Sequence, residues 1–335
     1  MRIGIFSVVD HYPKEIGRSV AQYYAELLES AELAEELGFD SFWIAEHHFH
    51  EYGAIPSPAV WMGAAAMRTR KIRLGVGVSV LPFHNPITVA EEYAMVDVLS
   101  GGRLEFGAGS GYLKHEFAGY GVALEEKHAR FDEALEVIER AWSGERFSYR
   151  GRFNRIDEVQ LQLQPLQKPR PPIMIATLRH EAAREVGTRG YPLLTIPYAQ
   201  STGLDQLTRM TGEFREAWNA AGHGDPSQPV VGCAVHTFVA GGAAEIEAHA
   251  KPSVDRYVRT RLYATSRPYE VLQEKKLIAS GSAEAVLKVL REYERAGFNY
   301  FLNIMDFGGM DHKAVMKSIE RFGREVLPAF PQPRA

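Results

Sequence analysis

Residues 34–44 read Ala34-Glu35-Glu36-Leu37-Gly38-Phe39-Asp40-Ser41-Phe42-Trp43-Ile44: the end of an amphipathic helix, a glycine, an aromatic residue and a short apolar strand. Glycine suits the left-handed residue that ends a helix, and the aromatic residue after it can pack back on that helix. The same unit recurs at residues 185–195 and 295–303. The chain therefore repeats a helix that leads directly into a strand.

Further apolar runs lie between these three copies. Most are continuously apolar, which is typical of parallel strands that are buried on both faces, and the segments between them have helical spacing. The apolar runs are 3–8, 72–81, 104–106, 173–176 and 230–239, and the helical segments are 19–37, 58–67, 88–99, 131–142 and 204–221. Together with the repeats they make eight strands, each with a following helix. Eight such units predict an α/β protein with a (β/α)8 TIM-type barrel.

The competing fold is a doubly wound open sheet. A dinucleotide-binding sheet of that kind has the pattern G-x-G-x-x-G after its first strand. Here the similar stretch, residues 107–112, follows the fourth strand and has Tyr112 at the last glycine position, so the barrel is favoured. Two stretches near 143–172 and 251–282 exceed ordinary loop lengths. Because helix and strand resume directly after each, we interpret both as insertions in a single barrel domain spanning 1–335.

Charge and composition narrow the class of protein. The 38 basic and 42 acidic residues give a net charge of -4, which provides no general attraction to nucleic acid or to an anionic membrane. We find no targeting segment and no run of 18 apolar residues. The single cysteine, Cys233, cannot form an internal disulfide and lies in an apolar run, as a core residue would. These features predict a cytoplasmic protein that binds neither nucleic acid nor a membrane.

The most distinctive strand end is the second one. Catalytic residues of such barrels lie at the carboxyl ends of the strands, and this strand runs into Glu46-His47-His48-Phe49-His50-Glu51. Histidine can act there as an acid, a base or a metal ligand, although a mixture of surface and buried structural histidines is the plainer alternative. A metal site needs ligands from other strand ends. The fifth and sixth ends supply none and the eighth only Asp306, so no metal is expected.

Other strand ends indicate room for a flat ligand and an anion. Gly75 and Gly77 lie within the third strand, where glycine indicates close approach of a ligand or simple packing against a helix. Small residues recur after the fourth strand. A helix follows the fifth strand. The free backbone N–H groups of the first turn of this helix, together with Arg179, can bind an anion. The glycine-rich residues 306–309 after the eighth strand are an alternative anion site, and the residues alone do not choose between them.

The run from Trp43 to Tyr112 resembles the bacterial luciferase-like flavin-dependent monooxygenases. The resemblance covers most of the chain and is strongest in the first 145 residues. The motifs that carry it are Glu46-His47-His48-Phe49, Leu81-Pro82, Asn85-Pro86, Ala90-Glu91-Glu92, Asp97, residues 99–104 and Phe106-Gly107-Ala108-Gly109, extended by residues 130–133, Leu135, 142–144 and 172–176.

This resemblance implies a barrel, usually dimeric, that uses reduced FMN as a cosubstrate and dioxygen to oxidise a small organic substrate. A separate flavin reductase would supply the reduced FMN, and the flavin would carry the oxygen chemistry. His47 is then the catalytic residue, whereas His48 and His50 are structural or solvent-facing. A non-proline cis peptide is expected at Gly77-Val78, against the flavin ring. The implied cofactor-binding residues are Gly77, Val78, Ser79, Ser110, Tyr112, Ala176, Thr177, Leu178 and Arg179.

The chain departs from the family pattern at three positions. Ser110 stands where luciferase has a phosphate-binding arginine, and Arg130-Phe131 replaces a motif that contains a tyrosine in sulfonate-cleaving members. Charge for the flavin phosphate must then come mainly from Arg179 and backbone amides. Gly109 stands where luciferase has a cysteine, which is consistent with a relative that does not emit light.

Two other functions remain open. A deazaflavin-dependent oxidoreductase would transfer hydride on the same barrel, but Glu46-His47-His48 resembles the oxygen-using branch. A non-catalytic flavin-binding protein is disfavoured because His47 is retained. The substrate pocket is expected around His11, Tyr52, Phe83, Tyr198 and the segment after Ile196, which does not identify the substrate.

The helical segment 58–67 is apolar almost all round. A helix without a polar face is normally covered on both sides, one of them by the barrel. A second copy of the chain, as in a twofold homodimer, would cover the other side. The alternative is cover by an insertion of the same chain.

Overall fold

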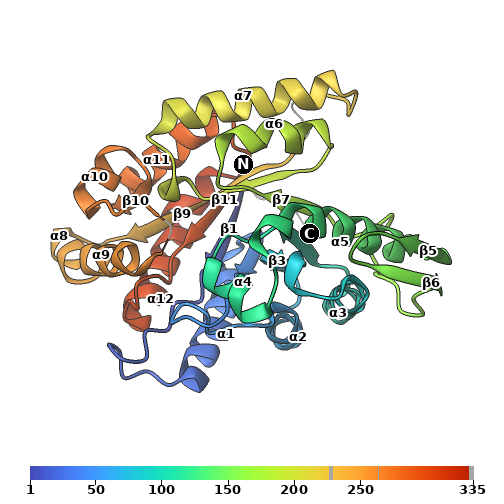
Figure 1. Ribbon diagram of the computed structural model, residues 1–335. Helices are drawn as coiled ribbons and strands as arrows, with labels where there is room; N and C mark the ends of the chain where they lie inside the picture. Colours follow the sequence, from blue (N-terminus) through green and yellow to red (C-terminus); the bar gives the residue numbers. More distant parts are fainter. Residues whose placement is uncertain (226–228, 263, 332–335) are drawn as a thin grey trace.

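Eight parallel strands close into a barrel in the computed structural model, which describes residues 1–225, 229–262 and 264–331 (Figure 1). Each strand pairs with the next around the barrel, and β8 and β11 both pair with β9 to complete the circle. The strands are β1 (Arg2–Ser7), β2 (Ser41–Ile44), β3 (Arg73–Val80), β4 (Leu104–Gly109), β7 (Ile173–Ala176), β8 (Leu193–Thr195), β9 (Val231–Val239) and β11 (Tyr300–Ile304). The predicted (β/α)8 barrel is confirmed.

Helices surround the barrel, and among the described residues none is long and apolar enough to cross a membrane (Figure 1). They are α1 (Val20–Leu37), α2 (Pro58–Arg68), α3 (Pro86–Ser100), α4 (Lys114–Tyr120), α5 (Lys127–Trp142), α6 (His180–Thr188), α7 (Leu204–Ala220), α8 (Ala243–Glu245), α9 (Lys251–Thr260), α10 (Tyr269–Glu274), α11 (Ala283–Arg295) and α12 (His312–Arg321). Short 3-10 segments lie at Leu81–Phe83, Leu124–Glu126, Pro197–Ala199 and Leu327–Ala329, and π-helical turns at Ile246–Ala250 and Phe322–Val326.

The repeated helix–glycine unit ends helices as expected. Gly38 has a φ of 85° and its N–H donates to the last carbonyls of α1, which is the left-handed helix end that glycine favours. Gly297 plays the same part after α11, with a φ of 95°. In the middle copy the left-handed residue is Gly190, whereas Gly187 lies inside α6. The chain thus turns from helix to strand within three or four residues at each copy.

The two predicted insertions contain structure of their own. Residues 143–172 hold the antiparallel hairpin of β5 (Phe147–Arg150) and β6 (Arg155–Val159), which extends away from the barrel in Figure 1. Residues 251–282 hold α9, α10 and β10 (Ile278–Gly281), a parallel strand that pairs with the last four residues of β9. The sequence analysis did not predict β10. Residue 263 of this insertion and residues 332–335 of the predicted domain lie outside the described residues, and the single-domain boundary stays a prediction.

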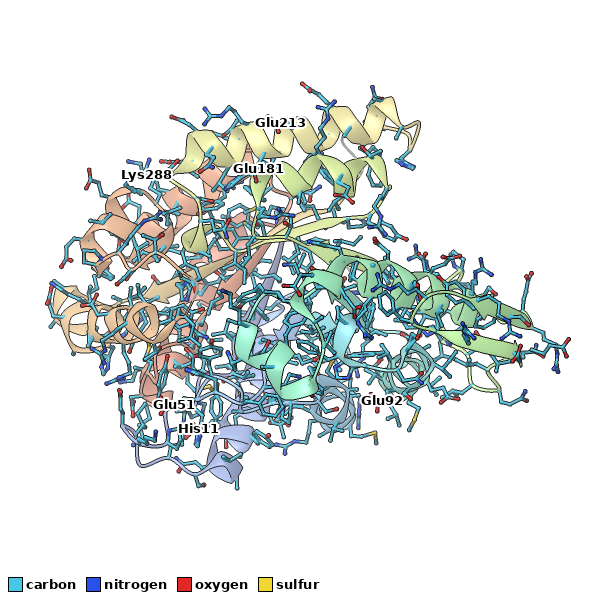
Figure 2. All side chains as sticks on the ribbon, in the orientation of Figure 1. His11, Glu51, Glu92, Glu181, Glu213 and Lys288 are labelled. Atoms are coloured by element: carbon cyan, nitrogen blue, oxygen red, sulfur yellow. The ribbon has the colours of Figure 1, made fainter. Side chains whose placement is uncertain are left out.

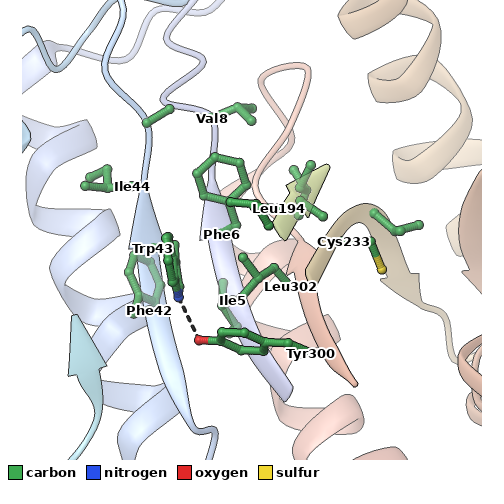
Figure 3. Packing of buried hydrophobic residues seen from close by; sticks show 14 of the residues in the cluster. Ile5, Phe6, Val8, Phe42, Trp43, Ile44, Leu194, Cys233, Tyr300 and Leu302 are labelled. Atoms are coloured by element: carbon green, nitrogen blue, oxygen red, sulfur yellow. Dashed lines mark hydrogen bonds between the residues drawn. The ribbon is translucent and has the colours of Figure 1, made fainter. Parts of the chain in front are cut away.

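The barrel interior is filled by large apolar side chains around Trp43 (Figure 3). The Trp43 indole N–H donates to the Tyr300 hydroxyl at 2.8 Å. A Cβ at Gly75 would lie only 2.1 Å from the indole ring. Glycine is therefore needed at 75 because Trp43 occupies that space, and neither a ligand nor the following helix explains it. Cys233 is fully buried in the same core, and burial raises the pKa of its thiol.

Charged side chains point outward from the helices, as Figure 2 shows for Glu181 on α6 and Glu213 on α7. The same view places His11 and Glu51 in neighbouring loops, and the backbone N–H of His11 donates to the carbonyl of Glu51 at 3.3 Å. This bond joins the loop after β1 to the loop after β2. The two loops thereby form one continuous side of the barrel mouth.

Candidate active site

A cavity of about 560 Å³ opens at the carboxyl ends of the barrel strands. Its wall is built from the ends of six strands, the first turns of α5 and α6, and the end of α9. The lining residues are Phe6, Val8, Ala45, Glu46, His47, Gly77, Val78, Val80, Gly109, Ser110, Gly111, Tyr112, Glu116, Lys127, His128, Phe131, Asp132, Ile175, Ala176, Thr177, Leu178, Arg179, Ala182, Glu185, Val186, Arg189, Leu194, Thr195, Ile196, Gln200, Tyr257 and Arg261. A cavity of this size holds a cofactor-sized ligand.

The structure brings most of the site residues inferred from sequence to this one cavity. His47, Gly77, Val78, Ser110, Tyr112, Ala176, Thr177, Leu178 and Arg179 all line it. Ser79 does not: it is 1% exposed, and its hydroxyl bonds to Tyr93 of α3. The reason is strand alternation, which turns side chains at 78 and 79 to opposite faces. We therefore leave Ser79 out of the site. The expected side chains of His11, Tyr52, Phe83 and Tyr198 are also absent from the lining, whereas Ile196 and Gln200 are present.

The Gly77-Val78 peptide is cis, as the resemblance implied. The pairing of β3 with β4 shifts register between Val76 and Ser79, next to this peptide. A Cβ at Gly109 of β4 would lie 2.5 Å from Cγ2 of Val78. Gly109 is therefore required because the Val78 side chain lies against it.

His47 is held from α4. Its ring Nδ1 lies 3.1 Å from Oε1 of Glu116, and the same oxygen accepts the backbone N–H of His48 at 2.9 Å. The rings of Tyr52 and Tyr112 stand nearly perpendicular to the His47 ring, with centroids 5.0 and 6.4 Å away. The sequence analysis did not select Glu116. The one feature of the sequence that could have indicated Glu116 was its position in the segment that follows the glycine-rich end of the fourth strand.

A second histidine network surrounds Glu46. Oε1 of Glu46 lies 3.0 Å from Nε2 of His48 and 2.7 Å from Nε2 of His84, and Oε2 accepts the backbone N–H of Val80 at 3.2 Å. The hydroxyl of Tyr120 lies 3.0 Å from Nδ1 of His48. His48 is buried and therefore not solvent-facing, and its structural role stays a prediction. The sequence analysis missed His84, although it follows the third strand end.

Burial and hydrogen bonding shift the pKa values of this network in opposite directions. Burial raises the pKa of the Glu46 carboxyl, but the hydrogen bonds from His48 and His84 outweigh burial and hold that pKa below its ordinary value. For His84, burial lowers the pKa, but the hydrogen bond and charge of Glu46 outweigh it and raise that pKa above 6.5. The ligand atoms of Glu46, His48 and His84 lie within 4.8 Å of one another. The three could hold a metal ion, but each Glu46 oxygen already has a protein donor, so the hydrogen bonds alone account for the cluster.

Because its pKa is raised, His84 should stabilise the fold in a pH-dependent way. The sign follows from linkage: the stabilisation is complete below the ordinary value of 6.5 and is lost as pH rises through the higher folded-state pKa. The loss of stability in His84→Gln, measured by thermal unfolding, should therefore be larger at about pH 6 than at about pH 9. A loss that is equal at both pH values, or larger at high pH, would contradict the Glu46–His84 pairing.

Cationic groups gather at one end of the cavity. Lys127 and His128 come from the first turn of α5, Arg179 precedes α6, and Arg189 follows it. Burial, and then the charge of Arg179, lowers the pKa of Lys127. Burial lowers that of His128, with Lys127 and Arg179 adding to the effect. Several cationic side chains that line one cavity favour an anionic ligand there. The sequence analysis found only Arg179 here, because α5 is distant in sequence.

Two details refine this anion site. Arg189 is paired with Asp132 at 2.8 Å, whereas Arg179 forms no ion pair with any described residue. The backbone N–H of Arg179 donates to Oγ1 of Thr177 at 3.1 Å, so that amide is already used and the guanidinium is the free group. At the alternative site after the eighth strand, the N–H of Gly308 donates to a carboxylate oxygen of Asp10 at 3.0 Å. An acid occupies that position, which disfavours an anion there.

Other lining residues are apolar and aromatic side chains together with a buried arginine. Arg261, just after α9, forms a buried ion pair with Asp10, and its guanidinium lies 3.8 Å from the ring centroid of Tyr257. Tyr257 and Arg261 show that the second insertion contributes to the cavity wall. Phe6 and Val8 of the first strand end complete this region.

Comparison with known proteins agrees with this architecture. The family model described as luciferase-like monooxygenase matches residues 1–300. The chain is similar to the crystal structure of the monooxygenase RslO1 from Streptomyces bottropensis, with a TM-score of 0.91, 27% identity, and coverage of 99% of this chain and 100% of that one.

Two curated relatives represent different cofactors. The oxygenase component of a flavin-dependent trigonelline monooxygenase from Acinetobacter baylyi is 26% identical and covers 98% of this chain and 96% of its own. An F420-dependent glucose-6-phosphate dehydrogenase from Amycolatopsis mediterranei is also 26% identical, over 90% of this chain and 93% of its own. The two relatives are thus named for different cofactors, a flavin and the deazaflavin F420. By its match over residues 1–300, this chain belongs to the luciferase-like monooxygenase family.

Proposed function

We propose that this protein is a flavin-dependent monooxygenase that takes reduced FMN as a cosubstrate and uses dioxygen to oxidise a small organic substrate. The observation that carries the proposal is one cavity whose wall holds His47 together with Arg179 and Lys127, two cationic side chains that form no ion pair with any described residue. The flavin-dependent relative, whose printed name is that of an oxygenase component, supports a separate flavin reductase as partner.

The residues present fit FMN. The strand end at Gly77 and Val78 offers a surface with little side chain for the flavin ring, near Tyr112. Arg179, with Lys127, would hold the phosphate by charge-assisted hydrogen bonds. When bound, reduced FMN supplies the electrons that activate dioxygen. Ser110, Ala176, Thr177 and Leu178 complete the proposed cofactor-binding residues.

His47 is the proposed catalytic residue. It is partly exposed to the cavity, with 13% of its side chain accessible, and its Nδ1 is engaged by Glu116. The remaining ring nitrogen is then available to move a proton to or from a bound reactant. Phe6, Val8 and Val80 line the same cavity and would exclude water from that proton transfer.

A deazaflavin-dependent hydride transfer is the second candidate, because a relative named for that coenzyme spans most of the chain. A non-catalytic flavin-binding role is less well supported, because a binding protein has no need of a histidine paired to a buried carboxylate in the cavity.

The test of the proposal is turnover with a flavin reductase, NADH, FMN and a panel of small apolar and aromatic compounds. We expect a product that carries one atom from labelled dioxygen and forms only when FMN is present. Hydride transfer to deazaflavin in the absence of oxygen, with no oxygenated product from any compound, would overturn the proposal in favour of the second candidate.

We propose further that the protein forms a homodimer through α2 and α3, in a cytoplasmic setting, with neither metal nor nucleic acid. The inner side of α2 is buried, including Trp61 and Met62, but Val60 is 74% and Met67 59% exposed. Met95 on α3 is 51% exposed. Neither insertion covers these side chains among the described residues, which supports cover by a second copy of the chain over cover from within the same chain.

Sedimentation should show a dimer at micromolar concentration. Val60→Lys should shift it to the monomer mass, because a buried charge opposes twofold pairing of apolar faces. Val20→Lys, which alters an exposed apolar residue of α1, is the matched control and should leave the dimer intact. A wild-type protein that sediments as a monomer would contradict the expected dimer.

A further inference from the structure

We propose that Glu116 is the positioning residue of His47: its carboxylate fixes the ring with hydrogen on Nδ1 and directs a basic Nε2 toward the cavity. This inference rests on the proposed function only in that His47 is taken as the catalytic group. The geometry concerns two residues 69 positions apart that β2 and β4 bring to one wall.

The protonation pattern follows from the shared acceptor. Oε1 of Glu116 accepts the backbone N–H of His48 at 2.9 Å, and a backbone N–H can only donate. An ionised carboxylate oxygen has a further lone pair, which can accept a second hydrogen from His47 Nδ1 at 3.1 Å. In neutral histidine, a hydrogen on Nδ1 leaves Nε2 as the acceptor. Glu116 thus selects the tautomer in which His47 can take a proton from a group in the cavity.

The aromatic neighbours of His47 do not determine which of two flipped orientations its ring adopts, so the hydrogen bond to Glu116 determines it. The ring planes of Tyr52 and Tyr112 lie at 79° and 84° to the plane of the His47 ring. These contacts restrict the tilt of the His47 ring. A half-turn of the ring would keep it between the same aromatic neighbours but would place carbon where Nδ1 now lies. The hydrogen bond to Glu116 distinguishes the two orientations. Glu116 is 3% exposed by side chain, so water competes little for its oxygens.

A purely structural role for Glu116 makes different predictions. The carboxylate also ties the backbone of His48 to α4, so its loss could act through the loop alone. In that case, variants would lose stability, the His47 tautomer would not change, and turnover would fall by the same factor with or without His47. The positioning role predicts a changed tautomer and an effect on turnover that disappears once His47 is removed.

The first experiment needs neither flavin nor turnover. Two-bond ¹H–¹⁵N correlation spectra of histidine-labelled protein report the tautomer of His47, assigned by comparison with His47→Gln. We expect the Nδ1–H tautomer in the wild type and in Glu116→Gln, whose amide oxygen can still accept both hydrogens, and a shift toward the Nε2–H tautomer in Glu116→Ala. An Nε2–H tautomer in the wild type, or an unchanged tautomer in Glu116→Ala, would overturn the inference whatever reaction the protein catalyses.

The second experiment is a double-mutant cycle on turnover with saturating reduced FMN. Glu116→Ala should lower kcat about 10- to 100-fold, the loss typical of partners that orient a functional histidine, with unchanged FMN affinity. It should have little further effect in a His47→Ala background. An equal loss in both backgrounds would show that Glu116 acts independently of His47. Glu116→Gln, which keeps the acceptor, covers the case in which Glu116→Ala does not fold and should lose less activity than Glu116→Ala where both fold.

Discussion

Replacing His47 with alanine is expected to lower product turnover by about 10² to 10⁴-fold, the range typical of general acid–base groups. FMN affinity should stay nearly unchanged, because the proposed phosphate contacts come from Arg179 and Lys127 and not from the histidine cluster. The measurement is product formation with saturating reduced FMN, alongside a separate FMN titration. Loss of turnover with retained binding would place His47 at the chemical step.

The neighbouring histidines provide the controls. His50 is partly buried and does not line the cavity, so His50→Ala should keep most of the activity. His48 is buried and bonded to Glu46, so His48→Ala should lower stability before it affects chemistry. A normal His47→Ala beside a stable but inactive His48→Ala would show that the wrong histidine has been assigned.

The second large effect concerns the phosphate. FMN should bind more tightly than riboflavin by roughly 10- to 150-fold, which corresponds to about 1.5 to 3 kcal/mol for a charge-assisted hydrogen bond. Arg179→Ala should remove most of this preference, because its guanidinium lines this part of the cavity and forms no ion pair with any described residue. Lys127→Ala should remove a smaller share. Titration of each variant with both flavins measures the difference.

Arg184→Ala is the matched control for this prediction. Arg184 lies on the same helix as the anion site but does not line the cavity, so its removal changes the overall charge equally. FMN preference should survive in this variant. Equal affinity for the two flavins in the wild type, or an equal loss in Arg184→Ala and Arg179→Ala, would remove Arg179 from the site.

The barrel could be predicted because a short run of consecutive residues in the sequence marks each of its strands. Continuously apolar runs mark strands buried on both faces, and Gly38 and Gly297 end the helices before them. β10 could not be predicted in the same way. Its four residues form a strand because β9 is longer than β11: pairing with β11 ends at His236, and β10 pairs with the last four residues of β9. That pairing depends on the closed barrel.

The site could be predicted in part for the same reason. His47 and Arg179 lie directly at strand ends, where position in the sequence indicates position in the barrel. Glu116 follows the fourth strand end closely, but nothing in that segment singles it out, and Lys127 reaches the cavity only through the later helix α5. At Gly75 the sequence analysis considered close approach of a ligand. The structure shows that the glycine is needed because Trp43 packs against it.

The choice between flavin and deazaflavin is tested most directly by anaerobic titration of the purified protein with reduced FMN and with a reduced deazaflavin coenzyme. The proposed function predicts that reduced FMN binds the wild type more tightly than the deazaflavin does and that the bound flavin reacts with dioxygen when oxygen is admitted. Tighter binding of the deazaflavin, together with no binding of reduced FMN, would contradict it.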